Sequence, residues 1–292
     1  MFYVIFDLEW NNVYSRKHKG FFNEIIEIGA VLTDESMLVL DTFSVFVRSQ
    51  LGKKLTGRTK TLTNISNEDL KDGLTFGRAV GEMKKWIGGR DCVFLSWGNS
   101  DVRTFLENYR YFLGSDKITV MKSYADLQKY CQTVMKIDPA NQIGLSAAAQ
   151  LLGIDTGKYS THRALEDCRI SLKCMKKCYD DNLFPGFVLK CDDSFYRRLA
   201  FKTHYITNIS NPKLDRSAFK CDCENCGRAA KRLSEWKVSG QSFRAMFYCK
   251  SCNVLILCGI RFKETFDGIS VTATQKSMEK EPISKNKQES VI

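Results

Sequence analysis

Apolar residues form short runs near the start of the chain, separated by polar turns. Three runs rich in β-branched and aromatic residues, and a fourth further along, predict strands at residues 2–6, 25–32, 39–47 and 93–97. A helical period of apolar positions predicts helices at residues 76–87, 101–113, 124–135, 145–152 and 164–179. Strands that come first, followed by helices interleaved with strands, predict an α/β protein with a mixed sheet flanked by helices.

The character of the chain changes after the last of these helices. We expect a first domain at residues 1–182, a linker region at 183–215 and a small domain at 216–273. Residues 274–292 are polar and rich in lysine, which predicts a disordered tail. The apolar run that starts at Phe2 leaves no room for a signal peptide, so we expect a soluble, cytoplasmic protein.

Charge adds a first indication of the partner. The 44 lysine and arginine residues outnumber the 33 acidic residues, which gives a net charge of +11. Residues 181–292 hold 19 basic and 12 acidic side chains, against 25 and 21 in residues 1–180, so the shorter part is the more basic. A polyanion such as nucleic acid is the expected partner, although solvated lysines alone could give the same balance.

Four of the twelve cysteines form two Cys-x2-Cys pairs with 22 residues between them: Cys223, Cys226, Cys249 and Cys252. This spacing predicts one structural Zn²⁺ in a zinc ribbon, and two pairs in tandem argue against a redox role. Cys221 is close enough in sequence to compete for a ligand position.

The segment around these cysteines mixes basic and aromatic residues. This mixture suits phosphates and exposed bases, although the aromatic side chains could instead fill a small core and a protein partner stays open. The residues concerned are Arg228, Lys231, Arg232, Lys237 and Arg244, with Trp236, Phe243 and Phe247.

Five polar residues are candidates for catalysis. Asp7 and Glu9 are two residues apart where the first predicted strand ends, so both carboxylates point to one side of the sheet. Asp101 follows the fourth strand, at the sheet edge where α/β proteins bind ligands. Asp167 faces the sheet from the last long helix, and His162 comes five residues before it. Taken singly, each has an ordinary alternative as a polar strand end, a first-turn acid or a surface histidine.

Together the five residues have the order Asp-x-Glu, Asp, His-x4-Asp and resemble the DEDDh exonucleases. The short sequence segments at residues 6–10, 24–30, 62–65 and 96–101 resemble those of the KapD-type branch and its eukaryotic relatives that trim histone mRNA and small RNAs. Asn64 departs from the glycine that relatives often carry, and Arg163 stands where the sister branch places its tyrosine base. The resemblance covers about residues 1–180 and implies a ribonuclease-H-like fold.

The resemblance also implies roles for individual residues. Two Mg²⁺ or Mn²⁺ ions would be held by Asp7, Glu9, Asp101 and Asp167, with Asp7 bridging them. His162 would be the general base, since its pKa suits proton transfer near neutral pH. The terminal nucleotide would be contacted by Leu8, Trp10 and Ile65, and Trp10 could equally pack in the core.

The function expected from these features is 3′-to-5′ exonuclease activity. The substrate would be single-stranded nucleic acid with a free 3′ end, RNA rather than DNA, with release of nucleoside 5′-monophosphates. A DNA-directed exonuclease and a non-cleaving nucleic-acid-binding module are the alternatives. Endonuclease or transferase activity on the same kind of sheet is a weaker option.

Overall fold

A computed structural model describes residues 1–17, 19–52, 54–138, 141–157, 159 and 162–278. The chain divides into two compact units, Met1–Ala200 and Phe201–Ile292. Among the described residues, no helix has the length and apolar character needed to cross a membrane.

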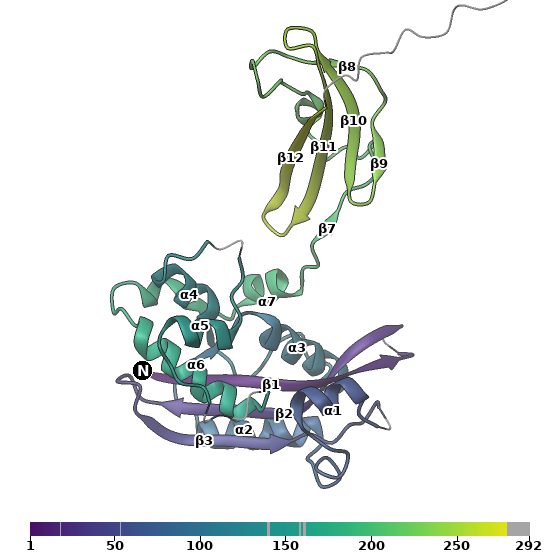
Figure 1. Ribbon diagram of the computed structural model, residues 1–292. Coiled ribbons are helices and arrows are strands. Elements are labelled where there is room, and N and C mark those ends of the chain that lie inside the picture. The colour runs from purple at the N-terminus through teal and green to yellow at the C-terminus, as the bar shows by residue number, and fades with distance from the viewer. Residues whose placement is uncertain (18, 53, 139–140, 158, 160–161, 279–292) are drawn as a thin grey trace, which may run out of the picture. The chain divides into compact units, whose positions relative to one another are not determined.

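A mixed six-stranded sheet forms the centre of the first unit, in the order β3-β2-β1-β4-β5-β6 (Figure 1). Its strands are β1 (Phe2–Ser15), β2 (Gly20–Thr33), β3 (Val39–Phe46), β4 (Cys92–Ser96), β5 (Ser123–Asp126) and β6 (Leu189–Lys190). β1, β2 and β3 pair antiparallel, whereas β4 runs parallel to both β1 and β5.

Helices cover both faces of this sheet. They are α1 (Gly57–Thr63), α2 (Phe76–Ile87), α3 (Ser100–Asn108), α4 (Leu127–Val134), α5 (Leu145–Leu151), α6 (Ala164–Cys178) and α7 (Asp193–Ala200), with a π-helical turn η1 (Tyr109–Leu113) after α3 and a 3-10 turn η2 (Phe184–Phe187) after α6. Alternation along β1 sends Val4, Phe6 and Leu8 into an apolar cluster with α2, α3 and α7. Tyr3 and Ile5 enter the other cluster, with α4 and α6. The expected mixed sheet flanked by helices is confirmed.

Several boundaries differ from the sequence-based expectation. β1 continues to Ser15, because its second half pairs with β2 in a long hairpin. The helix expected at residues 124–135 begins only at Leu127, because Tyr124–Asp126 belong to β5 and the Asp126 carboxylate caps α4 by accepting the Lys129 N–H at 2.9 Å. The segment expected as a linker contains η2, β6 and α7, which belong to the first unit.

The second unit is an antiparallel β domain. Its main sheet has the order β12-β11-β10-β8, to which β7 and β9 add short pairings. Its elements are β7 (His204–Tyr205), the 3-10 turn η3 (Arg216–Phe219), β8 (Lys231–Arg232), β9 (Lys237–Ser239), β10 (Ser242–Cys249), β11 (Val254–Thr265) and β12 (Gly268–Met278). The tail expected from residue 274 is therefore wrong as far as Met278, because these residues pair with β11. Residues 279–292 lie outside the described part.

Candidate active site and zinc centre

Three acidic side chains from distant parts of the sequence meet beside β1. Asp7 and Glu9 lie on β1, and Asp167 lies in the first turn of α6. One ligand atom from each of the three lies within 4.8 Å of the others. The structure therefore brings together three of the four acids expected to bind metal, in a spacing that a divalent cation can bridge.

The fourth acid, Asp101, is held next to this group. It is buried in the first turn of α3, and its Oδ1 accepts the backbone N–H of Leu8 at 3.2 Å. The turn before α3 is fixed through the carbonyl of Gly98, which accepts the hydroxyls of Ser96 at 2.7 Å and Tyr124 at 2.8 Å. Asp101 is thus bonded to the β1 residue that lies between Asp7 and Glu9.

Burial and neighbouring acidic charges act on all four carboxyls. Burial raises the pKa of Asp7 well above its usual range, and the neighbouring charges of Asp101 and Asp167 raise it further. Burial and then the charge of Asp167 raise the pKa of Glu9 to about 8. Burial raises the pKa of Asp101 to about 7 and also raises that of Asp167. Carboxyl groups that are crowded in this way resist ionisation. Divalent cations bound among them would offset the repulsion between the ionised carboxylates.

His162 stands at the exposed side of this group. Its backbone N–H donates to Asp167 Oδ2 at 3.2 Å, and the charge of His162 lowers the pKa of Asp167 against the effect of burial. Its φ of 63° lies in the left-handed region, where non-glycine residues are uncommon. The backbone bond to Asp167 helps to hold this conformation, which fixes His162 beside the acids. Residues 160 and 161 lie outside the described part.

The sequence reasoning missed a fifth acid, Glu27. This side chain is buried on β2 opposite Glu9, and its charge raises the pKa of both Asp7 and Glu9. Arg163 neutralises it through a forked pair, with Nη2 3.0 Å and Nε 3.2 Å from the carboxylate oxygens. The same carboxylate accepts the backbone N–H of Ala164 at 3.4 Å. Glu27 therefore joins β2 to the start of α6, which carries Asp167.

Close packing fixes the same junction. A Cβ added at Gly29 would lie 2.4 Å from backbone atoms of Ala164 and Leu165, so only glycine allows α6 to approach β2 at this point. A glutamate inside the apolar run at residues 25–32 was the sequence signal that could have identified Glu27.

The three residues expected to contact the terminal nucleotide are placed differently. Leu8 is 2% exposed in the main apolar cluster, and Ile65 is 1% exposed against Ile26, Leu55 and Leu70. Both side chains pack in the apolar interior, and their contact with the terminal nucleotide stays a prediction. Trp10 is partly buried against the main cluster, and its contact with the nucleotide stays a prediction.

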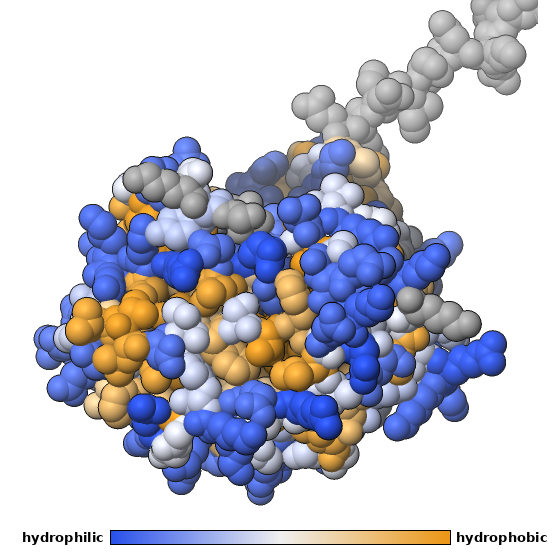
Figure 2. Space-filling view, turned by 90° about the horizontal axis from the view of Figure 1, so that it is seen from below, coloured by the Kyte–Doolittle hydropathy of each residue, from blue (hydrophilic) through white to orange (hydrophobic). Residues whose placement is uncertain are grey.

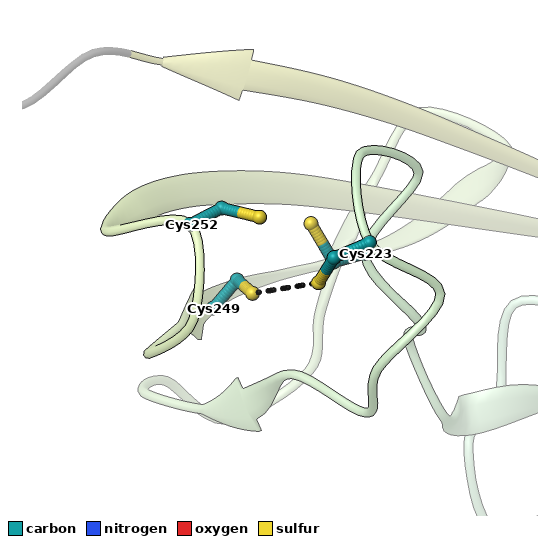
Figure 3. A group of neighbouring side chains, drawn as sticks. Cys223, Cys249 and Cys252 are labelled. Carbon is teal, nitrogen blue, oxygen red and sulfur yellow. Dashed lines mark hydrogen bonds between the residues drawn. The ribbon is translucent and has the colours of Figure 1, made fainter.

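Four thiols converge in the second unit, one pair from the loop at residues 223–226 and the other from the end of β10 and the turn that follows it. The labelled Cys223, Cys249 and Cys252 point toward a common centre (Figure 3). With Cys226 they form a group whose sulfur atoms lie within 4.8 Å of one another. A hydrogen bond from the backbone of Cys252 is the main cause that lowers the pKa of Cys249 to about 7, which favours a thiolate ligand. This donor set fits a four-cysteine zinc site.

The structure decides two alternatives that the sequence left open for this unit. Cys221 is paired with Cys258 in a disulfide and is not a member of the thiol group. Trp236, Phe243 and Phe247 are buried in the core of the unit, so they offer no platform for exposed bases. The five basic residues named with them are all exposed: Arg228, Lys231, Arg232, Lys237 and Arg244.

Comparison with known proteins agrees with the fold of the first unit. The exonuclease family model (RNase_T) matches residues 4–175, which is more than half of the chain. The probable 3′-5′ exonuclease KapD of Bacillus subtilis (strain 168) is 27% identical over 168 residues, which cover 57% of this chain and 78% of KapD.

Two solved structures share the fold at lower identity. The nuclease domain of 3′hExo, a DEDDh family member bound to rAMP, has a TM-score of 0.51 at 19% identity and covers 60% of this chain and 90% of that chain. The cell-death related nuclease 4 (CRN-4) has a TM-score of 0.52 at 15% identity. That match covers 60% of this chain and only 62% of CRN-4. The chain belongs to the exonuclease family, and it is a hydrolytic 3′-to-5′ exonuclease.

Proposed function

We propose that the first unit removes nucleotides from the 3′ end of single-stranded RNA and releases nucleoside 5′-monophosphates. The observation that carries this proposal is the convergence of Asp7, Glu9 and Asp167 within 4.8 Å, with Asp101 bonded to the strand between them. We propose RNA and not DNA as the substrate because the related nuclease domain of 3′hExo was solved with a ribonucleotide, rAMP.

The four acids would hold two Mg²⁺ or Mn²⁺ ions. Bound there, the ions would supply stabilisation of the attacking and leaving oxygens of the phosphodiester. His162, on the exposed side of the acids, would take the proton from the attacking water. Asp101 ties α3 to β1, and Glu27 ties the start of α6 to β2. Both bonds would help to hold the acids of these elements around one phosphate.

In the second unit, we propose one structural Zn²⁺ held by Cys223, Cys226, Cys249 and Cys252. All four ligands would be thiolates, which leaves no position for a reactive water, so this ion would not take part in hydrolysis. Because Trp236, Phe243 and Phe247 are buried, nucleic acid would be bound mainly through the exposed basic side chains.

The test is the time course of degradation of a 5′-labelled single-stranded RNA in Mg²⁺ or Mn²⁺. A DNA of the same sequence is run beside it, and a circular RNA without a 3′ end is the matched control. The proposal predicts a ladder that shortens from the 3′ end, faster for RNA, with the circle intact and EDTA abolishing turnover. Cleavage of the circle would indicate an endonuclease, and binding without turnover would indicate a non-cleaving module. Faster turnover of DNA would overturn the RNA assignment.

A further inference from the structure

The tip of the β1–β2 hairpin exposes two large aromatic side chains that the proposed mechanism does not use. Tyr14 and Phe21 are register partners with their ring centroids 5.9 Å apart, and they are 64% and 72% exposed. Figure 1 shows this hairpin, in purple, extending past the rest of the sheet. Apolar areas also occur elsewhere on the surface, as on the face seen in Figure 2, so exposure alone does not mark a binding site.

Positive charge surrounds the aromatic pair at this tip. Arg16, Lys17 and Lys19 are all exposed around the turn, and residues 10–23 contain no acidic residue. The next acid in the chain, Glu24, is buried and accepts hydrogen bonds from the Ser49 hydroxyl and from backbone N–H groups at residues 50–52. Its charge is therefore satisfied inside the protein, and the tip stays basic.

The hairpin is anchored, so the aromatic pair is presented on a supported element. Phe22, which pairs with Val13 on the opposite face, is buried and packs on Tyr111 with ring centroids 4.9 Å apart. The hydroxyl of Ser15 lies 3.3 Å from that of Tyr111. Because side chains alternate along a strand, burial of the Val13–Phe22 pair leaves the Tyr14–Phe21 pair facing outward.

We propose that this tip binds the single-stranded nucleic acid substrate away from its 3′ end, with bases stacked on Tyr14 and Phe21 and phosphates beside Arg16 and Lys19. Aromatic faces joined with cations are the combination that binds single strands without sequence preference. The inference rests on the proposed function for the identity of the ligand. Tyr14 is the fifth residue after Glu9 on β1, a span of roughly 17 Å along the strand. A dinucleotide at the acids would therefore not reach the tip, whereas a longer strand would.

The test compares wild-type chain with the double variant Tyr14→Ala/Phe21→Ala, using a 5′-labelled RNA of about 16 nucleotides and a dinucleotide. The expected result is a KM for the long RNA raised about tenfold or more, with kcat unchanged and the dinucleotide unaffected. Arg16→Ala/Lys19→Ala should lower the slope of log affinity against log salt concentration for the long RNA by about 1.4. The matched control is Leu38→Ala/Leu40→Ala, which removes two exposed apolar side chains far from this turn in sequence.

An unchanged KM and salt slope on the long RNA would overturn the inference, as would an equal loss on the dinucleotide. If the wild-type chain degrades neither substrate, the proposed function fails. Binding of the same RNA to the hairpin is then tested separately, by measuring its affinity by fluorescence anisotropy in EDTA. Equal affinity of wild type and double variant in that measurement would refute nucleic-acid binding at the tip.

Discussion

The carboxylate cluster of the first unit and the thiol cluster of the second each gather four potential metal ligands, but they are built differently. The carboxylates lie on β1, α3 and α6, which are supported by two large apolar clusters. The thiols lie in a small β domain with a single apolar cluster among its described residues. A large core can hold repelling charges in place, whereas a small domain depends on cross-links. We therefore expect metal ions to take part in catalysis in the first unit and to stabilise the fold of the second unit.

The largest expected effect is on turnover and comes from Asp7→Asn. This change removes one charged ligand from the carboxylate cluster without changing the size of the side chain. We expect kcat to fall by about 10³-fold or more, because the ions contribute several kcal/mol to the transition state. Thermal stability in EDTA should not fall, since a repelling charge is removed. A variant that unfolds would show that this cluster, too, supports the fold.

The second-largest expected effect is on proton transfer, and a change at His162 distinguishes it from metal binding. His162→Asn is the sharper variant, because asparagine tolerates the left-handed backbone found at this position. We expect kcat to fall by roughly 10²- to 10⁴-fold, the range for general acid-base groups. The Mg²⁺ concentration for half-maximal activity should stay the same. A change in KM alone would make His162 a binding residue.

A smaller loss of activity is expected from changing the Glu27–Arg163 pair. This pair acts on the carboxylate cluster indirectly, through the start of α6 and through the charge of Glu27. Glu27→Gln leaves Arg163 without its anionic partner and loosens the start of α6. We expect activity or Mg²⁺ affinity to fall about 10- to 100-fold, as for other groups that orient ligands. Arg163→Lys keeps the charge without the forked geometry and should lose less. Equal, unchanged Mg²⁺ titrations for both variants would exclude a positioning role.

The thiol cluster gives the smallest effect on turnover. Cys249→Ser should release zinc and unfold the second unit, while turnover of a dinucleotide continues at the wild-type rate. Cys191→Ser, a half-buried cysteine of the first unit, is the matched control. Metal analysis and circular dichroism provide the readout. Zinc-free wild-type protein, or a folded second unit in the variant, would contradict the assignment.

The sequence was sufficient to place the candidate acids, because their positions follow from local rules. Alternation on one strand puts Asp7 and Glu9 on the same side, and helical periodicity turns Asp167 toward the sheet. β5 was missed because its four residues are too few to show a strand period, and they run directly into α4. The burial of Ile65 and the pairing of Glu27 with Arg163 depend on contacts between segments far apart in the chain, which a local pattern does not contain.

The central claim is that the crowded acids form a cation site, and the pH dependence of thermal stability tests it most directly. The pKa of Glu9 is raised from 4.5 to about 8 in the folded protein, so the folded state binds this proton more tightly than the unfolded state. Stability in EDTA should therefore be greatest at low pH within this window and fall as pH rises from about 5 to about 8. Added Mg²⁺ should reverse the fall, and Glu9→Gln should make it shallower, because the other three acids with raised pKa values remain. A melting temperature that responds to neither pH nor Mg²⁺ across this range would contradict the account.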